Sequence, residues 1–268
     1  MKTIQSVINE IINNLQKVVV NDTVDRFIAG DPLSEVTGIV TTFTATMDVI
    51  KKTSEIGANL IITHEPTFYD HMDETSWLSK NATYSIKCKL IDEKKIVIWR
   101  FHDLLHYQKP DGIYVGMVKE LGWNDYVDQD FYSISNIPSV FNIPKIKLCE
   151  LATCMKNNFR MQGIRIVGNP DMECKRIGLF VGSGPGYDQV KFINDLNLDV
   201  FVCGETVEWQ TCEYVRDGAS SNLNKAMIVL GHANSEEAGM KYLVDWLKTF
   251  ILNVPITYIK AGDPFIYL

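Results

Sequence analysis

The chain has 268 residues, of which 46% are hydrophobic, and a formal net charge of −7 at pH 7. An acidic balance argues against a nucleic-acid binder, and no apolar run approaches the ~18 residues of a membrane helix. The six cysteines form no CxxC pair, which indicates free thiols and a cytoplasmic protein.

Helix and strand patterns alternate along the first half of the chain. Apolar residues at helical spacing over residues 4–15 predict an amphipathic core helix rather than a signal peptide. Strands are predicted over residues 38–43, 60–63 and 96–101, and helices over 46–56, 84–92 and 112–121. Such alternation predicts an α/β fold with a mostly parallel sheet covered by helices.

The stretch 125–144 is aromatic and polar, contains Pro138 and Pro144, and is predicted to be a linker or crossover. A second alternating set follows it. Helices are predicted over residues 148–159, 187–196, 209–216 and 235–250, and strands over 164–167, 177–181, 200–203, 227–230 and 256–259. The two similar sets suggest two αβ units.

His64 and Glu65 directly follow the apolar run of residues 60–62, which lies between Gly57 and Pro66. A short β-branched run with these boundaries predicts a buried strand. Open α/β sheets place their sites at the carboxyl ends of such strands. The pair is therefore a candidate for metal binding, and the alternative is a polar strand end that only begins a loop.

His102 and His106 form a second candidate pair, because the predicted strand 96–101 ends at His102. In a parallel sheet this end lies beside His64. The alternative is that His102 packs in the core and His106 is solvated. Two histidines beside another such pair favour a metal site.

His232 and Glu236 connect the predicted strand 227–230 to the helix that opens at Ser235. Side chains four residues apart on a helix can converge on one ion. For Glu236 the alternative is an acidic residue in the first helical turn, where it favours the helix dipole.

Two weaker features follow other predicted strands. The loop that contains Ser183, Gly184 and Gly186 has the composition of an anion-binding loop, but a plain tight turn explains it equally well. Glu205 follows the strand 200–203, where it either faces the same site or caps the next helix.

Five segments occur in the order found in a known family: GANLIITHEPTFY, RFHDLLH, GLFVGSGPG, DVFVCGE and GHANSEEAG. With them, the chain from Val36 to Phe265 resembles the Nif-three-like dinuclear-metal proteins, also called GTP cyclohydrolase 1 type 2 homologues. The resemblance implies two α/β domains with mostly parallel or mixed sheets, and a toroidal homo-hexamer. We predict one domain from residues 1–125 with 226–268, which carries the metal ligands, and another from 126–225.

The resemblance also implies a set of five metal ligands: His64, Glu65, His106, His232 and Glu236. The family pattern has a second histidine where this chain has Glu65, and an aspartate where it has His106. Both sets contain three imidazoles and two carboxylates, so the exchange keeps ligand number and formal charge. His102 matches a histidine outside the family's ligand set.

We therefore expect two divalent transition-metal ions (Zn, Fe, Mn or Co), which a mixed nitrogen and oxygen ligand set favours over calcium. The predicted function is metal-dependent hydrolysis of a small-molecule substrate, with a nucleotide as the candidate. Glu205 and His102 are the candidates for proton transfer. The alternative is a non-catalytic metal-binding assembly or regulatory partner, whose closed site would leave no open position for water.

Overall fold

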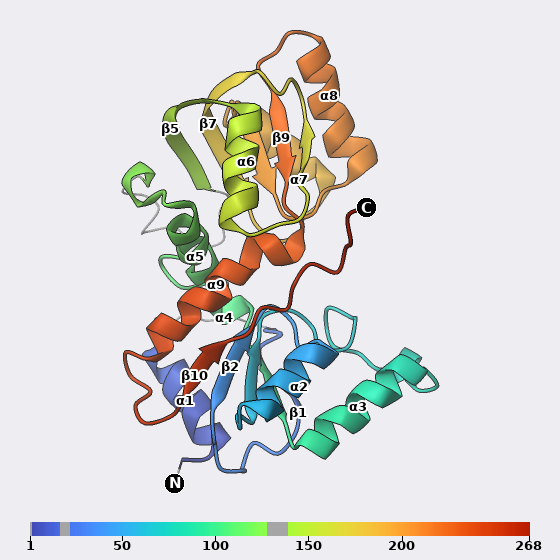
Figure 1. Ribbon diagram of the computed structural model, residues 1–268, viewed down its shortest axis with the longest axis vertical. Helices are drawn as coiled ribbons and strands as arrows, with labels where there is room; N and C mark the ends of the chain where they lie inside the picture. The colour runs from blue at the N-terminus through green and yellow to red at the C-terminus, as the bar shows by residue number, and fades with distance from the viewer. Residues whose placement is uncertain (1, 17–21, 128–138) are drawn as a thin grey trace. The chain divides into compact units, whose positions relative to one another are not determined.

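The computed structural model describes residues 2–16, 22–127 and 139–268, which form two compact units. The first unit comprises Met1–Gly112 and Gly239–Ala261, and the second comprises Ile113–Ala238 and Gly262–Leu268. Each unit contains a five-stranded sheet with helices (Figure 1), so the predicted α/β class with mixed sheets is confirmed. The predicted domain limits differ from these units at residues 113–125, 226–238 and 262–268.

The sheet of the first unit has the strand order β1-β4-β3-β2-β10. Its strands are β1 (Phe27–Ala29), β2 (Ile39–Thr42), β3 (Leu60–Thr63), β4 (Val97–Arg100) and β10 (Ile256–Tyr258). All neighbours pair in parallel except β1, which is antiparallel to β4. The unit also contains α1 (Ile4–Asn14), α2 (Met47–Glu55), the short 3-10 helix η1 (Ser76–Leu78), α3 (Ala82–Lys94) and α4 (Asp103–His106).

The sheet of the second unit has the order β5-β7-β8-β9-β6. Its strands are β5 (Ser139–Lys147), β6 (Arg165–Val167), β7 (Glu173–Phe180), β8 (Val200–Cys203) and β9 (Ala226–Val229). The central strands β7, β8 and β9 pair in parallel, and the edge strands β5 and β6 are antiparallel to their neighbours. Its helices are α5 (Gly112–Leu121), η2 (Asn124–Tyr126), α6 (Leu148–Asn158), α7 (Gly186–Asp195), the π-helix η4 (Glu208–Cys212) and α8 (Glu213–Ser220). The unit boundary falls within α9 (His232–Leu247).

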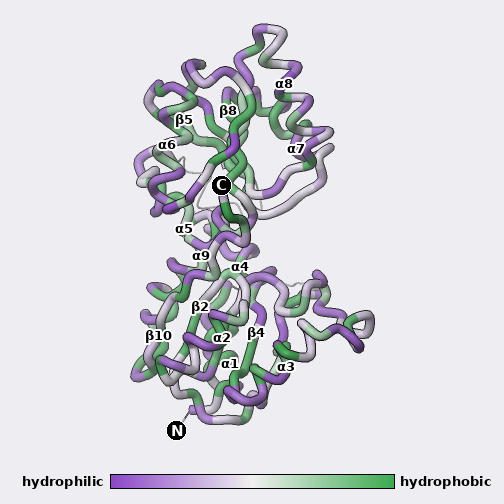
Figure 2. The backbone as a smooth tube through the Cα atoms, turned by 45° about the vertical axis from the view of Figure 1, so that its right-hand side comes forward, coloured by the Kyte–Doolittle hydropathy of each residue, from purple (hydrophilic) through white to green (hydrophobic). Residues whose placement is uncertain are grey.

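Each unit has its own hydrophobic core, and Figure 2 shows hydrophobic chain at the centre of both. Strands β2, β3 and β4 are buried along their whole length, as expected of parallel strands covered on both faces. Side-chain caps define where helices begin: the Thr46 hydroxyl accepts from Val49 N at α2, and the Asn81 side chain accepts from Tyr84 N at α3. The apolar strands are therefore the buried ones, and these helices begin after residues whose side chains can cap them.

The predicted linker 125–144 is wrong over residues 139–144, which belong to strand β5. Phe141 and Ile143 alternate inward on this strand while Asn142 and Pro144 face outward. An edge strand tolerates Pro144 because only one of its sides pairs. Residues 128–138 of the predicted linker lie outside the described residues.

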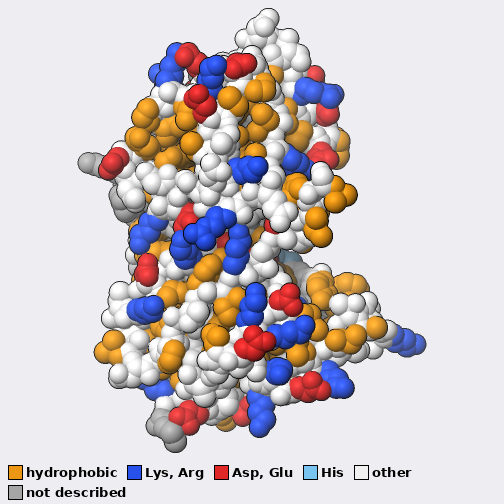
Figure 3. Space-filling view, in the orientation of Figure 1, with side chains coloured by type: hydrophobic (Ala, Val, Ile, Leu, Met, Phe, Trp, Pro, Cys, Tyr) orange, Lys and Arg blue, Asp and Glu red, His pale blue; other side chains and the backbone are white. Residues whose placement is uncertain are grey.

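Membrane spans, cysteines and surface charge, which were considered from composition, can be compared with the structure. Among the described residues, none of the helices combines the length and apolar character needed to cross a bilayer. All six cysteines are free, and burial raises the pKa of the Cys203 thiol. Basic and acidic side chains are interspersed on the face drawn in Figure 3.

Candidate metal centre

Three histidines of the first unit meet where two parallel strands end. Thr63 and Arg100 are the last paired residues of β3 and β4, so His64 and His102 emerge at the same edge of the sheet. Phe101 N donates to Thr63 O at 2.8 Å, which continues the ladder past the strand end. The close approach of these strand ends is what the parallel pattern predicts.

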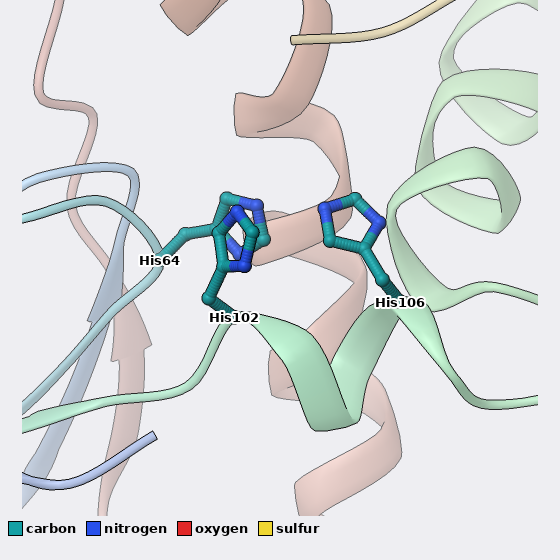
Figure 4. Close-up of side chains that lie close together, drawn as sticks. All are labelled: His64, His102 and His106. Carbon is teal, nitrogen blue, oxygen red and sulfur yellow. The ribbon is translucent and has the colours of Figure 1, made fainter. Parts of the chain in front are cut away.

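The single turn of α4 adds the third histidine. His106 N donates to His102 O at 3.1 Å, and this turn brings both rings to one side of the helix. The ring centroids lie 4.5 Å apart for His64 and His102, and 4.9 Å apart for each of the other two pairs. Figure 4 shows the three rings pointing toward one another. One nitrogen from each ring lies within 4.8 Å of the others, so this histidine triad could hold a metal ion.

Each ring of the histidine triad has a partner at Nδ1. His64 Nδ1 lies 3.2 Å from Phe101 O. His102 Nδ1 lies 2.8 Å from Asp103 Oδ1, and His106 Nδ1 lies 2.8 Å from Asp111 Oδ2. Hydrogen bonds of this kind orient metal-binding imidazoles and fix their tautomer. They assign Nε2 of each ring as the nitrogen that faces a metal.

The protonation state of His64 also suits a metal. Burial lowers the pKa of His64 well below its ordinary value, and the neighbouring His102 and His106 lower it further. His64 is therefore neutral near pH 7, as an imidazole ligand must be. Three imidazoles fit Zn, Fe, Co or Mn better than calcium or magnesium, which prefer oxygen ligands.

Glu65 lies at the margin of the histidine triad. Its Oε1 is 3.4 Å from His102 Nε2, and its Oε2 is 3.7 Å from Arg100 Nη2. The side chain is 14% exposed, so it is held largely inside the protein. A carboxylate in this position can add an oxygen ligand and negative charge to the imidazole set.

Sequence reasoning missed Asp25, which holds the short helix α4 in place. Its carboxylate accepts from the backbone N–H groups of His102 at 2.5 Å, Asp103 at 3.0 Å and Leu104 at 2.7 Å. Burial raises the pKa of Asp25 despite these hydrogen bonds. No local pattern identifies Asp25, because it is 77 residues from His102 along the chain.

Asp103 was missed as well, and His71 lies near the histidine triad without belonging to it. The hydrogen bond with His102 is the largest of the effects that lower the pKa of Asp103 to about 2. His71, the one histidine outside the predicted pairs, has its ring centroid 6.0 Å from that of His102. Asp103 could have been found from the sequence, because it directly follows His102 at a strand end. No comparable signal marks His71, which lies in a loop.

The second unit contains its own cluster of predicted residues. His232 and Glu236 are four residues apart on α9, with His232 Nε2 3.2 Å from Glu236 Oε2. His232 Nδ1 lies 2.9 Å from Glu205 Oε1. Glu236 is buried and Glu205 is exposed. Glu205 thus contacts His232 at Nδ1, and this contact orients the imidazole ring.

Glycines in two loops make room for this second cluster. Gly182 has a φ of +68°, and a Cβ there would lie 2.3 Å from Glu236 Oε1. A Cβ on Gly204 would lie 2.4 Å from Ser235 Oγ, which accepts a hydrogen bond from Gly182 N. The two loops can approach α9 only because these positions lack side chains.

Of the predicted anion-binding residues, Ser183 and Gly184 lie in the loop that contains Gly182, and Gly186 is the first residue of α7. A Cβ on Gly184 would lie 2.6 Å from the Phe180 ring, and one on Gly186 would lie 2.3 Å from Gln210 Oε1. Close packing therefore accounts for both glycines without a ligand. Anion binding by this loop stays a prediction.

The five ligands predicted from resemblance are divided between the two units. His64, Glu65 and His106 belong to the first unit, whereas His232 and Glu236 belong to the second. His102, predicted as a proton-transfer residue, is part of the histidine triad. Within the first unit the three rings of this triad are brought together, and the set of five ligands stays a prediction.

Comparison with known proteins gives consistent matches over nearly the whole chain. A family model described as Duf34/NIF3 (NGG1p interacting factor 3) matches residues 3–264. A protein of Clostridium acetobutylicum named GTP cyclohydrolase 1 type 2 homolog is 27% identical over 249 residues, covering 89% of this chain and 88% of the relative. A Clostridium perfringens protein of the same name is 24% identical over 240 residues, covering 85% and 86%.

A similar fold occurs in a solved structure, the Bacillus cereus protein related to NIF3. It superposes with a TM-score of 0.79 at 12% sequence identity, covering 100% of this chain and 99% of the other. This likeness supports the fold alone.

Proposed function

Because this chain belongs to the Duf34/NIF3 family, as the match over residues 3–264 shows, we propose that it is a metal-dependent hydrolase. The observation that supports the proposal is the histidine triad, in which three oriented imidazoles converge within 4.8 Å. The name of its relatives, GTP cyclohydrolase 1 type 2 homolog, suggests a nucleotide as the substrate class.

The residues of the first unit would bind and orient the metal. His102, His106 and the neutral His64 offer nitrogen ligands, and Asp103 and Asp111 hold the rings of His102 and His106 through Nδ1. A bound divalent ion would supply a Lewis acid that polarises a substrate oxygen. Glu65 would offset part of the positive charge and add an oxygen ligand.

Proton transfer is proposed for Glu205, with His102 as the second candidate. The exposed Glu205 carboxylate can exchange protons with solvent while its Oε1 contacts His232. His102 is less suited to this role if it binds metal, because a ligated Nε2 cannot take a proton. Glu205 is therefore the first residue to test.

Three further parts of the proposal rest on the family resemblance. They are two ions per chain with His232 and Glu236 as additional ligands, assembly into a homo-hexamer, and a cytoplasmic location. Metal content, sedimentation and cell fractionation test them separately.

Metal content is the decisive test of the proposed site. Wild-type protein purified without added metal and refilled with Zn²⁺ or Mn²⁺ should hold two equivalents per chain. His64→Ala and His106→Ala should each lose metal, whereas the control His71→Ala should keep it. Wild-type protein that never exceeds one tightly held equivalent would refute the two-ion site, and triad variants that bind as wild type does would refute the histidine triad as ligands.

Activity separates the two classes of function. Metal-loaded protein should hydrolyse a member of a panel of nucleotides, phosphoesters and amides, and His64→Ala should abolish the turnover. Metal-loaded protein that is inert toward the whole panel would favour the non-catalytic metal-binding assembly.

A further inference from the structure

Arg100 is a charged residue in a place where an apolar one is expected. It ends strand β4, is 0% exposed, and is the largest fully buried side chain in the described part of the molecule. A buried guanidinium is costly unless it is paired and hydrogen-bonded, and apolar replacements often stabilise a fold equally well. The charge of Arg100 therefore calls for an explanation beyond packing.

Among the described residues, the Arg100 side chain has four polar contacts, and all of them are to the segment 64–73, which follows β3. Arg100 Nε donates to His64 O at 3.1 Å, and Nη1 donates to His71 O. Nη1 also lies 3.7 Å from Asp73 Oδ2, and Nη2 lies 3.7 Å from Glu65 Oε2. One side chain thus holds both ends of the segment that passes beside the histidine triad.

The two carboxylates around Arg100 have different surroundings. Asp73 is anchored by the backbone, since its Oδ1 accepts from Thr67 N and Phe68 N, both at 2.9 Å. Glu65 instead spans two groups, with Oε2 toward Arg100 and Oε1 3.4 Å from His102 Nε2. Asp73 therefore stabilises the segment 64–73, whereas Glu65 connects the guanidinium to the histidine triad.

The distance from Arg100 to Glu65 is that of an ion pair rather than a hydrogen bond. Arg100 Nη2 has no hydrogen-bond partner among the described residues. The guanidinium therefore attracts the Glu65 carboxylate without fixing it by a hydrogen bond. Such an arrangement holds a ligand close to its bound position before the metal arrives, which reduces the ordering that binding requires.

We propose that Arg100 is a positioning residue that presents the Glu65 carboxylate to the histidine triad for metal binding. This inference rests on the proposed metal site and extends it to a residue that contacts no metal itself. Arg100 would act on the metal through the charge of Glu65, so its contribution to metal affinity should be lost when glutamine replaces Glu65.

A double-mutant cycle tests this dependence. The variants are Arg100→Lys, Glu65→Gln and the combination, with Zn²⁺ affinity measured by chelator competition. We expect Arg100→Lys to lower affinity by ~10–100-fold in the wild-type background and to have no further effect beside Glu65→Gln. Equal losses in both backgrounds would mean that Arg100 supports only the fold, and the proposal would be overturned.

A matched control separates loop support from ligand positioning. Arg26 donates to Met72 O in the same segment, so Arg26→Lys disturbs that segment at another point. It should leave Zn²⁺ affinity within about twofold of the wild type. A loss as large as that of Arg100→Lys would contradict a specific role for Arg100.

A structure of the metal-loaded wild-type protein keeps the test valid if Arg100→Lys does not fold. An anomalous map should locate the metal, and the electron density should place Glu65 Oε1 on it with Oε2 facing Arg100. A Glu65 carboxylate off the metal, or turned away from Arg100, would refute the proposal. Failure of the metal site itself is distinguishable, because His64→Ala would then bind metal as the wild type does.

Discussion

His106 and Asp111 form a buried pair in which the ring Nδ1 lies 2.8 Å from the carboxylate Oδ2. The Asp111 side chain is only 3% exposed. This carboxylate holds the ring with its Nε2 toward His64 and His102, so the orientation of a proposed ligand depends on a residue outside the predicted set.

The pair gives a direct prediction for Asp111→Asn. The change removes the carboxylate that favours the Nδ1–H tautomer of His106, so Zn²⁺ affinity should fall by ~10–100-fold. Chelator competition measures the loss. Asp70→Asn, in the loop after β3, is the control and should bind as wild type does. Unchanged affinity in Asp111→Asn would exclude an orienting role.

The exchanged positions Glu65 and His106 should be coupled. Glu65→His alone gives four imidazoles and one carboxylate in the predicted set, and His106→Asp alone gives two and three. The double change returns three and two, so it should bind metal more tightly than either single variant. Titration of the three variants checks this, and strictly additive losses would remove the compensation between the two positions.

Glu205→Gln should separate proton transfer from ligand orientation. Glutamine keeps an acceptor near His232 Nδ1 but cannot take a proton. Metal content should stay near that of the wild type while turnover on a responsive substrate falls by ~10²–10⁴-fold. Glu205→Ala, which also removes the acceptor, should lose metal as well. Unchanged turnover in Glu205→Gln would move the proton-transfer role to His102.

Gly182→Ala should disturb the second cluster by direct overlap. The new Cβ would lie 2.3 Å from Glu236 Oε1 at a φ of +68°. Gly122→Ala is a matched control, because its φ is +69° and a Cβ there meets nothing within 4 Å. The control should cost the backbone strain of ~1–2 kcal/mol, and Gly182→Ala should cost ~1–3 kcal/mol more. Denaturant unfolding measures both, and equal costs would show that the loop adjusts freely.

We predict that Lys87 makes the free energy of unfolding depend on pH in the alkaline range. It is 3% exposed, and burial lowers its pKa to about 8 from an ordinary value of 10.5. Between these values the unfolded chain binds more protons than the folded one, so stability should rise with pH across this window. The full rise would be on the order of 3 kcal/mol.

Chemical unfolding of Lys87→Met at several pH values checks the contribution of Lys87. The variant should lose most of the rise between pH 8 and pH 10.5, whereas Lys89→Met, an exposed change on the same helix α3, should keep it. Parallel pH profiles for the wild type and Lys87→Met would show that Lys87 titrates normally.

Sequence patterns alone were sufficient for the parallel strands and for the meeting of His64 with His102. Short apolar runs indicate buried strands, and the carboxyl ends of parallel neighbours lie at the same edge of the sheet. The spacing of His102 and His106 is likewise local, because one helical turn brings both rings to one side. The α/β class and the family resemblance followed from such short-range patterns.

Other features depend on contacts between residues far apart in the sequence. Asp25 reaches α4 from 77 residues away, and Glu236 requires a glycine at position 182 because the two are packed together. Edge strand β5 was hidden by Pro144 and by its polar outer face. Arg100 reads as part of an apolar strand, and only the folded chain places its guanidinium between Glu65 and Asp73. Periodicity determines which face of an element is buried, whereas the partners of a buried charge are set by tertiary packing.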